Sequence, residues 1–68
     1  MTTLEIVLPN RSFERLVALK ERTEAVSIEE VIKNALRLYE SMIDERDAGH
    51  EILVRDKDGN TLNYRIFA

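Results

Sequence analysis

The 68-residue chain contains no cysteine and a single histidine, His50. Without thiols, the chain has neither disulfides nor thiolate zinc sites, and one histidine cannot build a multi-histidine metal cage. His50 follows the glycine expected to end a helix, so an exposed loop position is predicted for it. No nucleophile–histidine pair suggests itself, and a domain this small leaves little room for a pocket around paired carboxylates. We therefore predict no catalytic site, no cofactor and no metal.

The chain also lacks length and long apolar runs. A domain of this size buries only about 60% of the surface that its unfolded form exposes, and it usually needs a disulfide, a metal or a second subunit. The first two are excluded, which leaves oligomerisation. The apolar stretch at residues 4–8 is short and is interrupted by Glu5. It resembles neither a signal peptide nor a membrane span, so a cytoplasmic protein without a membrane partner is expected.

The chain also lacks an excess of basic residues. Ten Lys and Arg residues face thirteen Asp and Glu residues, which gives a net charge of −3. Proteins that bind nucleic acids usually carry the opposite balance, so the composition counts against that function.

Within residues 2–8, Leu4, Ile6 and Leu8 alternate with Thr3, Glu5 and Val7, as in a half-buried strand. Pro9 ends the pattern. A helix over about residues 11–24 should follow, with Asn10 as its cap. Its apolar face is narrow, and we expect the stem of Lys20 to lie over apolar surface while the ammonium stays in water.

A second helix should begin at Ser27, because Ser27 and Glu30 have the spacing of a capping box, and Gly49 should end it. Its apolar side chains cover an arc of roughly 160° at ~100° per residue. Polar residues fill the other side, and there we expect Lys33 and Arg37 to pair with glutamates at helical spacing. The arc is formed by Ile28, Val31, Ile32, Ala35, Leu36, Leu38, Tyr39, Met42 and Ile43.

Apolar side chains recur at every second position near the C-terminus: Ile52 and Val54, then Leu62, Tyr64 and Ile66. This pattern predicts a β-hairpin with arms at 51–55 and 61–67. Residues 56–60 between the arms are rich in turn formers. They resemble the start of a calcium-binding EF-hand loop, but Thr61 and Phe67 stand where that loop needs glycine and glutamate. A plain hairpin turn is therefore the preferred interpretation.

The first strand and the long helix both predict that a second copy of the chain is needed. The strand has no neighbouring strand for over forty residues, and an unpaired edge must be paired or covered. The helix arc is wider than one narrow helix can cover. A twofold dimer, with first strands paired antiparallel and long helices packed together, meets both needs. In the alternative, a monomeric α+β fold, the hairpin pairs with the first strand of its own chain.

Two strings in this order resemble the ribbon-helix-helix family of DNA-binding proteins. "LEIVLPNRSFERL" is similar to that family's strand, proline and first helix, and "SIEEVIKNALRLYE" is similar to its second helix. The resemblance covers residues 3 to about 43. It implies a mainly α fold with a short N-terminal strand that forms an intermolecular antiparallel ribbon. Residues 1–49 would be the dimerisation and DNA-binding domain, and residues 50–68 a β-hairpin extension of it.

The resemblance also implies roles for individual residues. The ribbon of that family enters the DNA major groove, so Thr3, Glu5 and Val7 would read base edges. The start of the second helix would hold phosphates through Ser27 and Ile28, and Arg11 and Arg15 could reach the DNA backbone. The dimer core would be formed by Leu4, Ile6, Leu8, Val31, Ile32, Ala35, Leu36 and Tyr39.

Two departures from the family pattern stand out. Ala25 occupies the turn where the family often has glycine, so a left-handed conformation there would be strained by roughly 1 kcal/mol. The ribbon shows one ionisable residue, Glu5, where basic or amide side chains are usual. Glutamate can accept a hydrogen bond from cytosine, but it adds nothing to phosphate neutralisation.

Two functions therefore remain open. The first is a homodimeric regulator of transcription, a repressor or autoregulator, with double-stranded operator DNA as its partner. The second is a protein-interaction module of antitoxin-like or adaptor type, which would present the acidic residues Asp44, Glu45, Asp47 and Glu51 to a protein partner.

Overall fold

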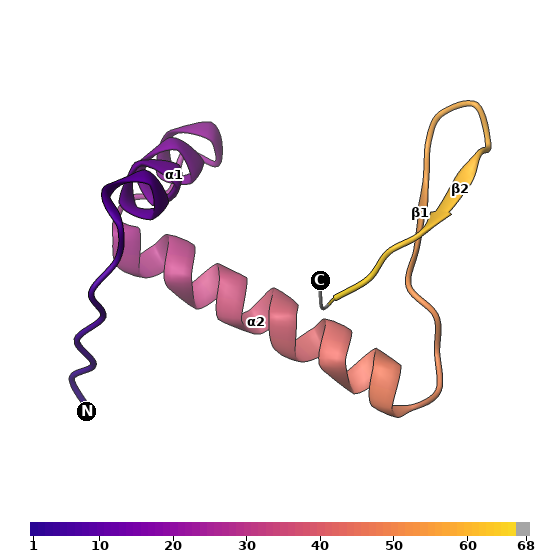
Figure 1. Ribbon diagram of the computed structural model, residues 1–68, viewed down its shortest axis with the longest axis horizontal. Helices are drawn as coiled ribbons and strands as arrows, with labels where there is room; N and C mark the ends of the chain where they lie inside the picture. The colour runs from indigo at the N-terminus through magenta and orange to yellow at the C-terminus, as the bar shows by residue number, and fades with distance from the viewer. Residues whose placement is uncertain (67–68) are drawn as a thin grey trace. The chain divides into compact units, whose positions relative to one another are not determined.

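The computed structural model describes residues 1–66 and is mostly helical (Figure 1). Helix α1 spans Asn10–Arg22 and helix α2 spans Ile28–Asp47. Strands β1, Leu53–Arg55, and β2, Thr61–Asn63, form a two-stranded antiparallel sheet. The chain divides into two compact units, Met1–Asn34 and Ala35–Ala68, with the boundary inside α2. The predicted mainly helical composition is confirmed.

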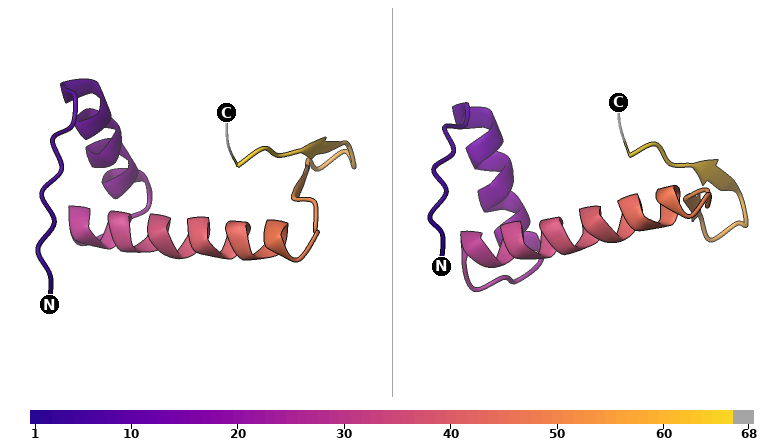
Figure 2. Two further views of the ribbon diagram at one scale, coloured as in Figure 1. Left: turned by 60° about the horizontal axis from the view of Figure 1, so that its bottom comes forward. Right: turned by 90° about the horizontal axis from the view of Figure 1, so that it is seen from below.

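The predicted N-terminal strand is absent from the single chain. Residues 1–9 belong to neither a helix nor a strand. A strand exists only through hydrogen bonds to a neighbour, and no segment within residues 1–66 pairs with this one. The segment passes the first turn of α2 in all views (Figures 1 and 2).

The start of α1 also differs from the prediction. Pro9 stands at the N-cap position with an extended backbone (φ −56°, ψ 149°), and no side chain caps the helix. The Pro9 carbonyl accepts hydrogen bonds from the N–H groups of Ser12 at 3.0 Å and Phe13 at 3.1 Å. Asn10 lies inside the first turn, so the expected cap by its side chain is wrong. Proline fixes φ near −65°, which suits the residue from which the helix starts.

The turn that ends α1 is built around Glu24, not Ala25. Glu24 has a φ of 57° and is the one non-glycine residue of 1–66 in the left-handed region. The N–H of Ala25 donates to the Lys20 carbonyl at 3.0 Å, and the N–H of Glu24 donates to the Glu21 carbonyl at 3.3 Å. This pair of bonds is the Schellman motif. The predicted strain at Ala25 is therefore misplaced by one residue, because the helix ends earlier than expected.

Both ends of α2 follow the predicted signals. The N–H of Glu30 donates to Ser27 Oγ at 3.1 Å, and the Glu30 carboxylate accepts the N–H of Val26 at 3.0 Å. The second bond reaches one residue further back than in the usual capping box. At the other end Gly49 has a φ of 83°, and the N–H groups of Gly49 and His50 bond the carbonyls of Arg46 and Glu45 at 2.9 and 3.0 Å. This is a second Schellman motif.

The sheet is shorter than the predicted arms. Val54 pairs with Leu62 in its centre, and the N–H of Tyr64 donates to the Ile52 carbonyl at 2.8 Å just beyond it. These four side chains therefore share one face, since cross-strand partners point the same way. The predicted second arm ran to Phe67, which lies outside the described residues.

The loop between the strands is organised by Asp56. Its Oδ1 accepts the N–H groups of Asp58 at 2.9 Å and Asn60 at 3.0 Å, and its Oδ2 accepts Asn60 Nδ2 at 3.3 Å. Hydrogen bonds to the ionised form, first of all that from the backbone N–H of Asn60, hold the pKa of the Asp56 carboxyl below its usual 3.8. Within the turn formers of residues 56–60, the Asp56 carboxylate thus accepts the side-chain hydrogen bonds that hold the loop.

Little of the chain is buried. Val31, at 7% exposure, is the one buried side chain of the described residues, while Leu16, Val17 and Lys20 on α1 are half-buried. Many large apolar side chains of the predicted dimer core are exposed, among them Ile32, Leu36 and Tyr39. Within residues 1–66 no helix has the length and apolarity to cross a membrane.

Candidate nucleic-acid interface

The side chains of the N-terminal segment differ in solvent exposure. Val7 is 98% exposed, whereas its neighbours Ile6 and Leu8 are 60% and 39% exposed. Thr3, Glu5 and Leu4 are also exposed. The alternation expected of a ribbon is therefore visible at residues 6–8, even though the segment has no pairing partner. None of the side chains assigned to the inner face is buried in the single chain.

The start of α2 offers backbone donors but also carries acid. The first N–H groups of a helix have no acceptor within it. Here Ser27 accepts the N–H groups of Glu30 and Val31 through its Oγ and its carbonyl, at 3.1 and 3.4 Å. The amides of Ile28 and Glu29 are left to meet an anion, aided by the helix dipole. The carboxylates of Glu29 and Glu30 stand in the same turn and oppose a phosphate.

Arg11 and Arg15 lie four residues apart on α1, on one side of the helix, and both are exposed. The first turn of α1 contains no acidic residue. Neither arginine takes part in an ion pair with another residue of 1–66. Both guanidinium groups are therefore available to a phosphate.

All three predicted contact sets belong to the unit Met1–Asn34. The N-terminal segment, the exposed side of α1 and the capped start of α2 are thus parts of one compact body. Sequence reasoning missed the opposing acid: Glu30 was recognised as a capping residue, but its carboxylate also lowers the attraction of this helix start for an anion. The spacing of Ser27 and Glu30 already contained that signal.

The ion pairs of the structure are not those expected from helical spacing. Residues 1–66 include an Arg46–Asp47 ion pair at 3.3 Å and a contact of 2.7 Å between His50 Nδ1 and Glu45 Oε2. Lys33 and Arg37 pair with none of the nearby glutamates, so that prediction is wrong. His50 is exposed as predicted, but it has a carboxylate partner, Glu45, that it reaches across the Schellman turn.

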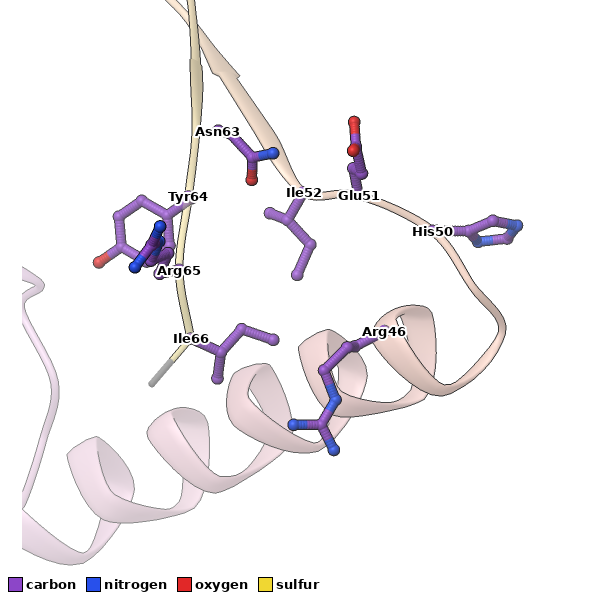
Figure 3. A pocket seen from close by; sticks show the side chains of 8 residues that line it. All are labelled: Arg46, His50, Glu51, Ile52, Asn63, Tyr64, Arg65 and Ile66. Carbon is purple, nitrogen blue, oxygen red and sulfur yellow. The ribbon is translucent and has the colours of Figure 1, made fainter. Parts of the chain in front are cut away.

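The second unit contains two neighbouring hollows that the sequence did not reveal. An apolar groove of about 410 Å³ lies between α2 and the sheet, and it is lined by Ala35, Leu38, Tyr39, Met42, Ile52, Val54, Tyr64 and Ile66. A smaller hollow of about 300 Å³ adjoins it (Figure 3). There Ile52 and Ile66 point toward α2, while His50 points away. The described residues include no group of three or more His, Asp or Glu that could hold a metal ion.

Comparison of the chain with protein-family models, curated protein sequences and solved structures found no match.

Proposed function

We propose that the chain is a homodimeric, sequence-specific DNA-binding regulator of the ribbon-helix-helix type. The N-terminal segments of two copies pair antiparallel and enter the major groove as a two-stranded ribbon, which that groove admits. The unpaired segment of a single copy is then one half of the ribbon. The exposed arc of α2 is the surface that the second copy covers.

One observation carries this proposal. In the unit Met1–Asn34, a segment without a pairing partner but with alternating exposure at residues 6–8 leads into α1 and passes the capped start of α2. A ribbon and a helix N-terminus in one body supply the two kinds of contact that DNA recognition needs. The ribbon reads base edges, and the helix start with nearby arginines positions the protein on phosphates.

The residues divide between these tasks. Thr3, Glu5 and Val7 face the bases, and the Glu5 carboxylate accepts a hydrogen bond from a cytosine amino group. The amides at Ser27 and Ile28, with that of Glu29, receive a phosphate oxygen. Arg11 and Arg15 neutralise phosphates beside it. Because few cations take part, we expect weak binding with a shallow dependence on salt.

Glu5 provides the test, in a binding assay on DNA from upstream of the gene at about 50 mM salt. Glu5→Gln should change base preference, with a difference of ~1–3 kcal/mol at the base that Glu5 reads. Glu5→Lys should raise non-specific affinity and steepen the salt dependence, because it adds phosphate neutralisation. Glu21→Gln, which removes the same charge at the end of α1, is the matched control and should leave base preference unchanged.

A second function, a protein-interaction module of antitoxin-like or adaptor type, is favoured by the exposed acid. Glu5 and Glu29 lie beside the proposed DNA contacts, and Asp44, Glu45 and Asp47 are exposed near the end of α2. If the wild-type chain does not shift its upstream DNA at about 50 mM salt, while Glu5→Lys binds all sequences alike, the DNA-binding proposal is wrong and this alternative takes its place.

A further inference from the structure

Four side chains of α2 form an apolar seam along the helix: Ile32, Leu36, Tyr39 and Ile43. They are separated by four, three and four residues, which is the spacing of the contact positions in a coiled coil. Ile32, Leu36 and Tyr39 are 46%, 65% and 47% exposed, and Ile43 is half-buried. A seam of this kind in water requires another helix.

The sheet of the same chain does not cover this seam. The groove between α2 and the sheet takes the adjoining side of the apolar arc, through Ala35, Leu38 and Met42, and shares only Tyr39 with the seam. The arc of α2 is thus divided lengthwise. One side faces the sheet, and the side of Ile32, Leu36 and Ile43 is left for a different molecule.

The two flanks of the seam differ in charge. One flank carries Lys33, Glu40 and Asp47, all exposed, and the other carries Ile28, Ala35 and Met42. Lys33 and Glu40 form no ion pair with any residue of 1–66. When two such helices pack in parallel, the charged flank of each meets the apolar flank of the other. When they pack antiparallel, like flanks meet, so charge faces charge.

We infer that the seam of one copy packs antiparallel on the seam of a second copy, with Lys33 of each opposite Glu40 of the other. In this register Ile32 packs on Ile43 of the second copy, and Leu36 packs on Tyr39 of the second copy. The inference rests on the proposed dimer and adds its helix orientation and its charge pairing. Charge complementarity along one flank selects a copy of this chain as the occupant of the seam.

The test uses the full chain with the variants Lys33→Glu and Glu40→Lys. Each variant alone places like charges opposite each other twice per dimer, so its dimer dissociation constant should rise about tenfold. Mixed together, the two variants restore opposite charges at both places. Native mass spectrometry of the mixture should therefore show heterodimers in clear excess over both homodimers.

Arg37→Glu is the matched control, because Arg37 is an exposed cation of α2 away from both flanks of the seam. It should leave the dissociation constant within about twofold of the wild-type value. Far-UV circular dichroism of each variant at high concentration checks that the helices are retained. Lys33→Gln and Glu40→Gln, which remove the attraction without adding repulsion, serve as milder replacements and should weaken the dimer by about threefold.

Two results would overturn the inference. Variants that dimerise like the wild type, with a mixture in statistical proportions, would contradict the antiparallel register while leaving the proposed DNA-binding dimer in place. A wild-type chain that stays monomeric up to high micromolar concentration would contradict the seam and the proposed dimer together.

Discussion

Glu24 is the residue at which the backbone departs most from what its side chain prefers. A φ of 57° costs an L-residue roughly 1–2 kcal/mol, and glycine avoids that cost. The chain nevertheless places glutamate there, and the Schellman bonds of Glu24 and Ala25 hold the conformation. The turn between the helices is therefore strained at one identified position.

Glu24→Gly should raise the free energy of unfolding by about 1 kcal/mol, since the relief of strain exceeds the entropy lost by glycine. Ala25→Gly is the control and should lower stability by roughly 0.5–1 kcal/mol, because Ala25 is not in the left-handed region. Urea denaturation at one fixed protein concentration measures both. The reverse order of the two variants would place the strained residue at Ala25.

Asp56 gives a second prediction at this scale, concerning pH. Its lowered pKa means that the ionised carboxylate stabilises the loop at pH values above the usual pKa of 3.8. This contribution is lost as the pH falls through the lower folded pKa. An NMR titration should give Asp56 a midpoint below 3.8, and the amide signals of Asp58 and Asn60 should follow the same curve.

The matched variant for that titration is Asp56→Asn, which retains an acceptor oxygen but has no proton to take up. The amide signals of Asp58 and Asn60 should then stay constant through the acid range. A wild-type midpoint at or above 3.8 would show that the hydrogen bonds to Asp56 do not persist in solution.

At the scale of elements, the helix boundaries show which sequence signals are reliable. The start and end of α2 were predicted from Ser27, Glu30 and Gly49, because each of these residues satisfies backbone groups that the helix leaves unpaired. The start of α1 was misjudged because Pro9 and Asn10 are both plausible first residues. Sequence alone could not show that the Pro9 carbonyl begins the hydrogen-bond ladder.

Ser27→Ala should therefore destabilise the fold by about 1 kcal/mol, whereas Asn10→Ala should change stability by less than about 0.5 kcal/mol. The first variant removes the acceptor of the Glu30 N–H, and the second removes a side chain that caps nothing. Thermal unfolding followed by circular dichroism compares the two. Equal losses would mean that Asn10 caps α1 in solution.

An alternating pattern predicts a strand reliably only where the same chain supplies a strand to pair with it. At β1 and β2 the alternation coincides with a short antiparallel sheet, because a loop of only five residues, 56–60, separates the two strands. The same pattern at residues 2–8 gave no strand, since no described segment lies opposite it. In the candidate site Thr3, Glu5 and Val7 are exposed, but so are Leu4, Ile6 and Leu8, which the pattern assigned to the inner face. The sequence could not show the groove beside α2, which depends on how the chain folds back after Gly49.

At the scale of the whole molecule, one chain buries little apolar surface: Val31 is the one buried side chain of residues 1–66. The proposed dimer would add apolar burial, which is the main favourable contribution to folding. Light scattering at micromolar concentration should give a mass of about 16 kDa, twice the 7.9 kDa of one chain. The melting temperature should rise with concentration, as mass action requires. A well-folded species of about 8 kDa with a constant melting temperature would contradict the proposed dimer.

The unpaired N-terminal segment also bears on how long each chain survives in a cell. Proteases preferentially cleave exposed backbone that is not held by hydrogen bonds. Residues 1–8 form no backbone hydrogen bond with another described residue. If pairing in the ribbon shields this segment, degradation acts on the unassembled fraction alone. Turnover would then be fast when the chain is scarce and slow when it is plentiful, so that abundance sets lifetime.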